Sequence, residues 1–455
     1  MHLPARHAQN GCRLVFPRQR PDAHFFGVLV ALPRELLQYL DAVPLIMTAP
    51  GAVPTLSLVD LATDAELLTG GPELALEVPD AYLSDARFER AGVESLAIQR
   101  LLTLAQRHVR LKIVWAGAAA RQVLSAPALY PLAAVALGLT NAAHTCLDER
   151  SFSVRNFERA RQSLLTHRLG TDMFSERQIL LCLDHRSPSL PFDLYEPSTQ
   201  RLRRDDEFES FVDDLLFAQR AAGFPANTLS KFRLPLAVIL RELIENTDDH
   251  AKTDFDGSVV KPNAMRGLVI KRILEKRRLP TKRLAGGPSL PCLEFTIFDS
   301  GIGYYDSYRR QLLRGQARGE PVTVGDKQTD TIRRFSLGPD VPIDTEYAIL
   351  LKCLERHSDK AIPDPRPGHR GMGLYEVLRA LKMMQGMLEV RTGRLHGYRS
   401  FLEGELRIQL EPETSQTRPG MPKPSLIDVA RNNLTKPTAQ ELMRGSVVRV
   451  VVPLT

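Results

Sequence analysis

A strand-like segment that ends in an aspartate and two closely spaced glycines restricts the fold of this chain more than any other feature. Residues 293–299 read LEFTIFD, and the chain continues as SGIG. The alternation of side chains predicts a strand, and Gly301 and Gly303 predict a turn that leaves the strand without a side-chain clash. Asp299 would then stand at the strand end, where its carboxylate can accept a hydrogen bond from the exocyclic amine of a base. An ordinary β-turn would have the same residues.

A helix-like segment upstream carries a second group of polar residues. The apolar spacing predicts a helix from about Leu234 to His250, with Pro235 in the first turn, where its missing N–H costs little. In the stretch LRELIENTDDHA, Glu242 and Asn246 lie four residues apart and would share one helix face with His250. A carboxamide oxygen can ligate Mg²⁺, and a carboxylate can take a proton from an attacking hydroxyl. A solvated acidic helix face has the same composition. The apolar residues predicted to pack inward are Leu240, Leu243 and Ile244.

A third segment, RPGHRGMGLYEVLRALKMMQG, places two glycines at the start of a helix. Gly371 and Gly373 directly precede apolar residues at helical spacing. Glycines at this position let backbone N–H groups and the helix dipole approach phosphate oxygens. Arg370 abuts the glycines and is a candidate phosphate contact, although an exposed loop arginine would look the same.

The chain is long enough for at least two domains. Its 455 residues exceed the size of an ordinary single core. From residue 25 to 186, short apolar runs alternate with helix-like stretches, which predicts an α/β domain. A Pro-rich, charged linker places a boundary near Asp205. We therefore predict an N-terminal α/β domain over 1–205 and a second domain over 206–455, an α+β two-layer sandwich of helices and antiparallel strands. Its strands are expected at about 265–273, 293–299, 387–393, 405–411 and 446–454.

Charge and cysteine usage narrow the partners and the compartment. A formal net charge of +7 favours an anionic partner such as nucleotide or nucleic acid. The basic runs 271–283 and 309–318 are either solvated loops or contacts to such a partner. Five widely spaced cysteines without a CxxC pair fit a reducing cytoplasm. Residues 1–20 lack the apolar core of a signal peptide, and the apolar stretch 127–143 is short for a bilayer span, so we expect a cytoplasmic protein without a membrane segment.

The order of the three segments resembles a known motif series. An ExxxN helix, a DxGxG turn after a strand, and a GxG before another helix are similar to the motifs of the GHKL ATPases, which include gyrase, heat-shock chaperones, sensor kinases and MutL-type repair proteins. The resemblance covers residues 228–455 and includes the terminal segment MRGSVVRVVVPL, which is similar to the closing strand of the family. It implies the Bergerat fold, a two-layer α/β sandwich that binds ATP.

The resemblance also implies roles for the matching residues. Glu242 would be the general base, Asn246 the Mg²⁺ ligand, and Asp299 the acceptor for the adenine amine. Asp249 matches an acidic pocket position of chaperone and MutL relatives, whereas His250 matches the helix of anti-sigma factors and sensor kinases. The family's Gly-Thr pair on the closing strand corresponds here to Gly445 and Ser446, and Ser446 keeps the hydroxyl. The residues implied to shape the pocket and phosphate lid are Gly301, Gly303, Arg370, Gly371 and Gly373.

The activity implied is Mg²⁺-dependent ATP binding and slow hydrolysis that drives a conformational switch, in a regulatory or defence protein of bacterial type. Glu242 indicates proton abstraction, either from water or, in a kinase of anti-sigma type, from a protein serine. A long lid insertion over 304–370 favours hydrolysis. An ATP-controlled nucleic-acid clamp is a third hypothesis, based on the basic runs. The family also implies a homodimer, while the protein partner is unknown and the N-terminal domain would be a sensor, a partner-binding module or an effector.

Overall fold

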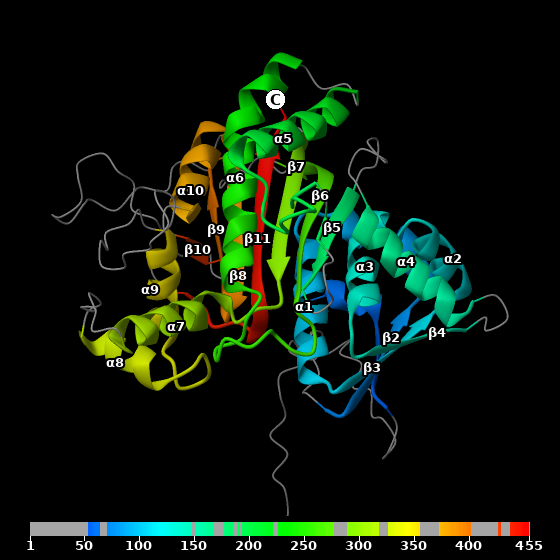
Figure 1. Ribbon diagram of the computed structural model, residues 1–455, viewed down its shortest axis with the longest axis horizontal. Coiled ribbons are helices and arrows are strands. Elements are labelled where there is room, and N and C mark those ends of the chain that lie inside the picture. Colours follow the sequence, from blue (N-terminus) through cyan, green and yellow to red (C-terminus); the bar gives the residue numbers. More distant parts are fainter. Residues whose placement is uncertain are drawn as a thin grey trace, which may run out of the picture. The chain divides into compact units, whose positions relative to one another are not determined.

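The computed structural model describes two sheets and the helices that cover them (Figure 1). The described residues are 53–63, 71–147, 152–167, 177–184, 190–191, 193–221, 226–276, 289–317, 326–354, 373–401, 426–428 and 437–454. Val53–Thr455 forms one compact unit. Within the described ranges, no helix is both long enough and apolar enough to cross a membrane.

The first sheet is parallel and has the order β1-β2-β3-β4. Helices connect its later strands, as the alternation of apolar runs and helix-like stretches predicts. Its core includes the buried side chains of Leu101, Trp115 and Leu132. The strands are β1 (Thr55–Ser57), β2 (Glu73–Val78), β3 (Arg110–Trp115) and β4 (Ala142–Cys146). The α-helices are α1 (Val93–Arg107), α2 (Gly117–Ser125), α3 (Pro131–Gly138) and α4 (Val154–Thr166), with short 3-10 helices at Leu58–Ala62, Asp80–Ser84, Ala86–Glu89 and Pro127–Leu129.

The second sheet has seven strands in the order β10-β9-β8-β11-β7-β6-β5, and every neighbouring pair is antiparallel. The described part of the chain is therefore mixed α/β, with one parallel and one antiparallel sheet. The strands, in chain order, are β5 (Arg177–Leu183), β6 (Met265–Lys276), β7 (Ser289–Asp299), β8 (Met387–Gly393), β9 (Leu395–Ser400), β10 (Ile427–Asp428) and β11 (Met443–Pro453).

Helices α5 (Asp205–Ala221), α6 (Ala226–His250) and α10 (Gly373–Met383) share a hydrophobic core with one face of the seven-stranded sheet, and Figure 1 shows α5 and α6 over its central strands. The predicted inward residues Leu240, Leu243 and Ile244 are buried in that core, which confirms their orientation. Helices α7 (Gly303–Ala317), α8 (Asp326–Arg334) and α9 (Ile343–Leu354) follow the glycine turn and enclose a small core of their own.

The opposite face of the seven-stranded sheet packs on the helices of the parallel sheet. Along β11, Val448 and Val450 belong to the core beneath α6, whereas Val447 belongs to the core that contains α1. Successive side chains of a strand point to opposite faces, so β11 is covered on both sides. Burial on two faces explains why its sequence is an almost continuous apolar run rather than an alternating one.

Two elements differ from their predicted form. Helix α6 begins at Ala226, so Pro235 lies inside the helix and not in its first turn. Packing against α5 explains the longer helix, because Phe232 is buried in the shared core and Arg233 forms ion pairs with Glu209 (3.3 Å) and Asp213 (2.8 Å). Strand β5 precedes residue 205 yet pairs with β6. The division into domains at residue 205 stays a prediction. The strand predicted over 405–411 lies outside the described residues.

Candidate functional site

Asp299 ends β7 and is buried at the junction of three strands. In the ladder it faces Ser446 of β11 on one side and Arg266 of β6 on the other. Its Oδ1 accepts a hydrogen bond from the Gly301 amide (2.8 Å), and the Ser446 amide also donates to the carboxylate. Burial outweighs these bonds and raises the pKa of Asp299 to about 6. A carboxylate buried this deeply at a strand end is costly to maintain, which marks Asp299 as a candidate functional group.

Two glycines let the backbone approach closely around Asp299. A Cβ atom on Gly301 would stand 2.7 Å from the Cα of Ala251, the residue that follows α6. Gly445 has a φ of +71°, and a Cβ there would stand 1.9 Å from the carbonyl oxygen of Asp299. The backbone of the glycine turn therefore packs closely on the end of α6, and the backbone of β11 packs closely on the end of β7. These contacts bring the first and second sequence motifs and the closing strand together.

Two hydroxyl groups lie at the same level of the sheet as Asp299. Ser446 is the register partner of Asp299 on β7 and of Thr392 on β8. The two hydroxyl oxygens are 3.3 Å apart, and Thr392 Oγ1 also accepts a hydrogen bond from the Tyr304 amide (3.2 Å) at the start of α7. One carboxylate and two hydroxyls thus line up across β7, β11 and β8. Ser446 was predicted, whereas Thr392 was not, since its position depends on strand register.

Helix α6 carries the remaining predicted polar residues. Glu242 and Asn246 are partly buried, and Asp249 is exposed. Because α6 ends beside Gly301, Asn246 lies about 7 Å and Glu242 about 13 Å along the helix axis from Ala251. The first motif therefore extends away from the Asp299 end of the site. His250 is partly buried, and this burial lowers its pKa, so the imidazole is neutral at neutral pH.

A buried arginine ties α6 to the sheet beside Asp299. The side chain of Arg266 is 2% exposed and forms ion pairs with Asp184 (2.7 Å) and with Asp248 of α6 (3.1 Å). The Tyr195 hydroxyl accepts a further hydrogen bond from Arg266 (2.7 Å) and donates one to Asp248 (3.0 Å). Asp248 lies between the predicted residues Asn246 and Asp249, so this cluster fixes the helix segment that carries them. A charged residue inside the apolar run MRGLVI is the sequence signal that could have found Arg266.

The glycines of the third motif and the predicted phosphate contact are only partly covered by the structure. Gly373 begins α10, whereas Arg370 and Gly371 lie outside the described residues. Gly303 begins α7 directly after the glycine turn. Helix α10 packs in the same core as α6, which places the start of the third motif on the same side of the sheet as the first.

The basic runs that suggested an anionic partner contain side chains with internal partners. Lys271 is buried and donates a hydrogen bond to the carbonyl oxygen of Phe88. Arg309 donates to the carbonyl of Ile332 (2.8 Å), and Arg310 donates to Thr253 Oγ1 (2.7 Å). These cations bond to other parts of the chain itself, and residues 277–283 and 318 lie outside the described part. In that described part, no group of three His, Cys, Asp or Glu side chains is arranged to hold a metal ion.

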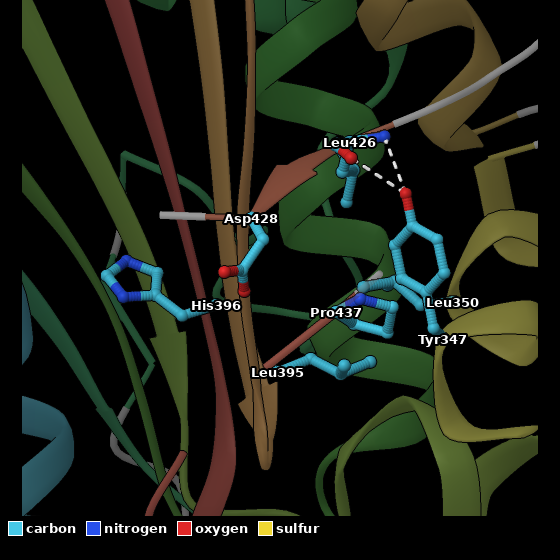
Figure 2. Close-up of a pocket in the computed structure, with 8 residues that line it drawn as sticks. Tyr347, Leu350, Leu395, His396, Leu426, Asp428 and Pro437 are labelled. Atoms are coloured by element: carbon cyan, nitrogen blue, oxygen red, sulfur yellow. Dashed lines mark hydrogen bonds between the residues drawn. The ribbon is translucent and has the colours of Figure 1, made fainter. Parts of the chain in front are cut away.

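A small pocket lies between α9, β9 and β10 (Figure 2). Its polar groups already have partners: the Tyr347 hydroxyl donates to the Leu426 carbonyl (2.7 Å), and Asp428 accepts a hydrogen bond from the Thr438 hydroxyl (2.9 Å). The first bond attaches the residue before β10 to α9, and the second attaches β10 to the segment before β11. None of the residues predicted for the functional site lines this pocket, which we interpret as structural.

Comparison of the chain with protein-family models, with curated proteins and with solved structures gives no match.

Proposed function

We propose that the chain binds Mg-ATP beside Asp299 through a Bergerat-type domain and hydrolyses it slowly. The observation that carries this proposal is the row formed by Asp299, Ser446 and Thr392 across three neighbouring strands. The close approach of Gly301 to Ala251 places the end of α6 beside this row. An antiparallel sheet with α6 and α10 on one face is compatible with the two-layer sandwich that the motifs imply.

The row has the chemistry to recognise adenine. A carboxylate accepts hydrogen bonds, and adenine presents an amine donor at the position where guanine presents a carbonyl oxygen. Guanine would therefore direct an acceptor at the Asp299 carboxylate and be repelled. The hydroxyls of Thr392 and Ser446 can both donate and accept, so they can complete the contacts of the base edge directly or through water.

Helix α6 would hold the phosphate end of the nucleotide. Asn246 offers a carboxamide oxygen for Mg²⁺, a cation that commonly takes few protein ligands and completes its shell with phosphate oxygens and water. The ion would neutralise charge on the phosphate groups. Glu242, one turn earlier, would accept the proton of the attacking water. The segment that contains α7, α8 and α9 starts at the glycine turn and would change its contacts as nucleotide binds and leaves.

ATP binding and phosphate release test this proposal when they are measured together for the wild type, Glu242→Gln and Asp299→Asn. We expect slow release by the wild type, binding without release for Glu242→Gln, and at least about tenfold weaker binding for Asp299→Asn, because a charge-assisted hydrogen bond is lost. Glu245→Gln is the matched control, since Glu245 is a partly exposed carboxylate on α6 that pairs with Arg241 (3.6 Å). It should behave as the wild type.

The alternatives give different results in the same assay. Wild-type protein that binds ATP without releasing phosphate would contradict hydrolysis, and transfer of phosphate to a protein serine would favour a kinase of anti-sigma type. Binding to nucleic acid that depends on ATP and falls steeply with salt would favour the clamp. Absence of ATP binding by the wild type would overturn the proposal.

A further inference from the structure

Helix α1 of the parallel sheet contacts the backbone directly behind the candidate adenine site. Gln99, Thr103 and Gln106 recur at intervals of four and three residues and so share one face of the helix. Gln99 Nε2 donates to the carbonyl of Arg391 (3.3 Å), and Thr103 Oγ1 accepts from the Arg444 amide (3.0 Å). Arg391 and Arg444 directly precede Thr392 and the Gly445-Ser446 pair. Two of the three strands in the row are therefore held by α1.

The contact between Thr103 and Arg444 falls at an irregularity of β11. The register between β11 and β8 shifts between Met443 and Ser446, and Gly445 lies inside this shift. A shift of this kind interrupts the ladder and re-aims the residues that follow it. Thr103 is 2% exposed and supplies a buried acceptor for the Arg444 amide at this point. We therefore expect the position of Ser446 to depend on a side chain of helix α1.

The third connection passes through Asn263, which is fully buried. Its backbone carbonyl accepts hydrogen bonds from the Ser300 hydroxyl (2.5 Å) and from Gln106 (3.4 Å). Its side chain accepts from the Thr140 amide (2.6 Å) and donates to Asn141 Oδ1 (2.8 Å). Ser300 follows Asp299, so the loop before β4 and the end of α1 are joined to the strand end that carries the carboxylate.

We infer that α1 positions the adenine end of the nucleotide site, with Thr103 as a positioning residue for Ser446, so that the parallel-sheet part of the chain sets nucleotide affinity and base preference. This inference rests on the proposed function. A ligand or partner that displaces α1 would move three backbone segments around the row at once. Conversely, nucleotide bound to the row would stabilise one arrangement of α1, because coupling between two sites acts in both directions.

The test compares Thr103→Val with the wild type for binding of ATP and GTP. Valine keeps the size of threonine and removes the acceptor for the Arg444 amide, so we expect about tenfold weaker ATP binding and a reduced preference for ATP over GTP. Thr103→Ser restores the hydroxyl and should restore both. Ser95→Ala is the matched control, because Ser95 is a buried hydroxyl on α1 whose bond goes to Gly92 (2.7 Å) and not to the seven-stranded sheet.

A second readout uses protein without nucleotide. Amide hydrogen exchange at the start of β11 should be faster in Thr103→Val than in the wild type or in Ser95→Ala, because the Arg444 amide loses its partner. Gln106→Met, at a partly exposed position of the same helix face, is the second variant if Thr103→Val does not fold, and it should shift base preference in the same direction through Asn263.

The outcomes separate this inference from the proposed function. If the wild type binds ATP and the folded variants keep wild-type affinity and base preference, the positioning role of α1 is overturned while the proposed function stands. Faster exchange without a change in base preference would also overturn it, because the hydrogen bond would then only support the strand. If the wild type binds no nucleotide, the proposed function fails and the inference fails with it.

Discussion

The backbone beside Asp299 requires a glycine at position 445. Its φ of +71° is rarely adopted by residues with a side chain, and the missing side chain leaves room for the Asp299 carbonyl, which would otherwise lie 1.9 Å from a Cβ atom. The following residue, Ser446, is thereby brought into register with Asp299. Resemblance to a family marked this pair in the sequence, and the backbone geometry now supplies the physical reason for its glycine.

The raised pKa of Asp299 predicts that base binding depends on pH. With a pKa of about 6, only about one tenth of the folded molecules carry the ionised carboxylate at pH 5, so adenosine binding should be about tenfold weaker at pH 5 than at pH 7. Adenosine is the preferred probe because it has no phosphate that titrates in this range. Titration calorimetry from pH 5 to pH 8 measures the effect, and constant affinity across that range would contradict it.

Folding of the ligand-free protein should respond to the same group with the opposite sign. The pKa of Asp299 in the folded protein lies above its unfolded value near 3.8, so the folded state holds the proton more tightly. The contribution of Asp299 to the free energy of unfolding is therefore fully present below about pH 4 and is lost as the pH rises through about 6. Asp299→Asn serves as the control, since it should remove the pH dependence of both adenosine binding and this contribution to stability.

Residues of the site differ in how far the sequence reveals them. Asp299 and Gly301 stand in a local pattern of strand and turn, which a sequence shows directly. Thr392 joins the row only because β8 pairs with β11 in one register, and Asn263 matters only because the loop at Thr140 reaches it. Both relationships connect residues that lie far apart in the chain. Local periodicity and motif spacing therefore cannot predict them.

At the scale of elements, the cluster around Arg266 predicts how α6 is anchored. Replacing Arg266 by methionine would leave Asp184 without its buried partner, whereas Asp248 would keep its ion pair with Lys252 (2.6 Å). We expect the free energy of unfolding to fall by about 3–5 kcal/mol, because removing one member of a buried ion pair leaves an uncompensated charge. Urea unfolding measures the change. Nucleotide affinity should fall as well, since Asp248 belongs to the helix turn that follows Asn246.

Arg204→Met is the matched control for this prediction. The Arg204 side chain is 81% exposed, and its ion pairs with Asp206 (3.9 Å) and Glu207 (3.8 Å) lie at the surface. Exposed pairs contribute little, so this change should cost less than about 1 kcal/mol. Equal losses of stability for the two variants would show that the Arg266 cluster does not anchor α6.

Helices and strands were predicted best where a local hydrophobic pattern alone determines the type of element. The apolar spacing of 234–250 gave a helix, and the alternating run before Asp299 gave a strand, as the structure confirms. The first turns of α6 were missed because its extension to Ala226 depends on ion pairs and apolar contacts with α5. Strand β5 was missed as a member of the second sheet for a related reason: its partner β6 lies far along the chain, beyond α5 and α6.

In the whole compact unit, the two faces of the seven-stranded sheet pack in two different hydrophobic cores. One core lies beneath α6 and α10, and the other contains α1 and the parallel sheet. Met265 and Phe298 of the seven-stranded sheet pack in the second core. Asp299 directly follows Phe298 in β7. A ligand bound to Asp299 would therefore contact the sheet whose two faces pack in the two cores. This arrangement predicts that the two sheets unfold together.

Trp115 provides the measurement for this last prediction. It is the single tryptophan of the chain, it is fully buried in β3 of the parallel sheet, and its indole N–H donates to His144 Nδ1 (3.2 Å). Burial lowers the pKa of His144 to about 3, so its ring is neutral and can accept this bond. The fluorescence of Trp115 therefore reports on the parallel sheet, while far-ultraviolet circular dichroism reports on both sheets.

ATP at one hundred times its dissociation constant should stabilise the folded protein by about 2.7 kcal/mol. If the sheets unfold as one unit, ATP raises the unfolding midpoint seen by Trp115 as far as the midpoint seen by circular dichroism. GTP, with a carbonyl in place of the adenine amine, is the control and should shift both midpoints less than ATP does at the same concentration. A nucleotide shift confined to circular dichroism would show that the parallel sheet unfolds separately. Nucleotide binding would then not be coupled to α1.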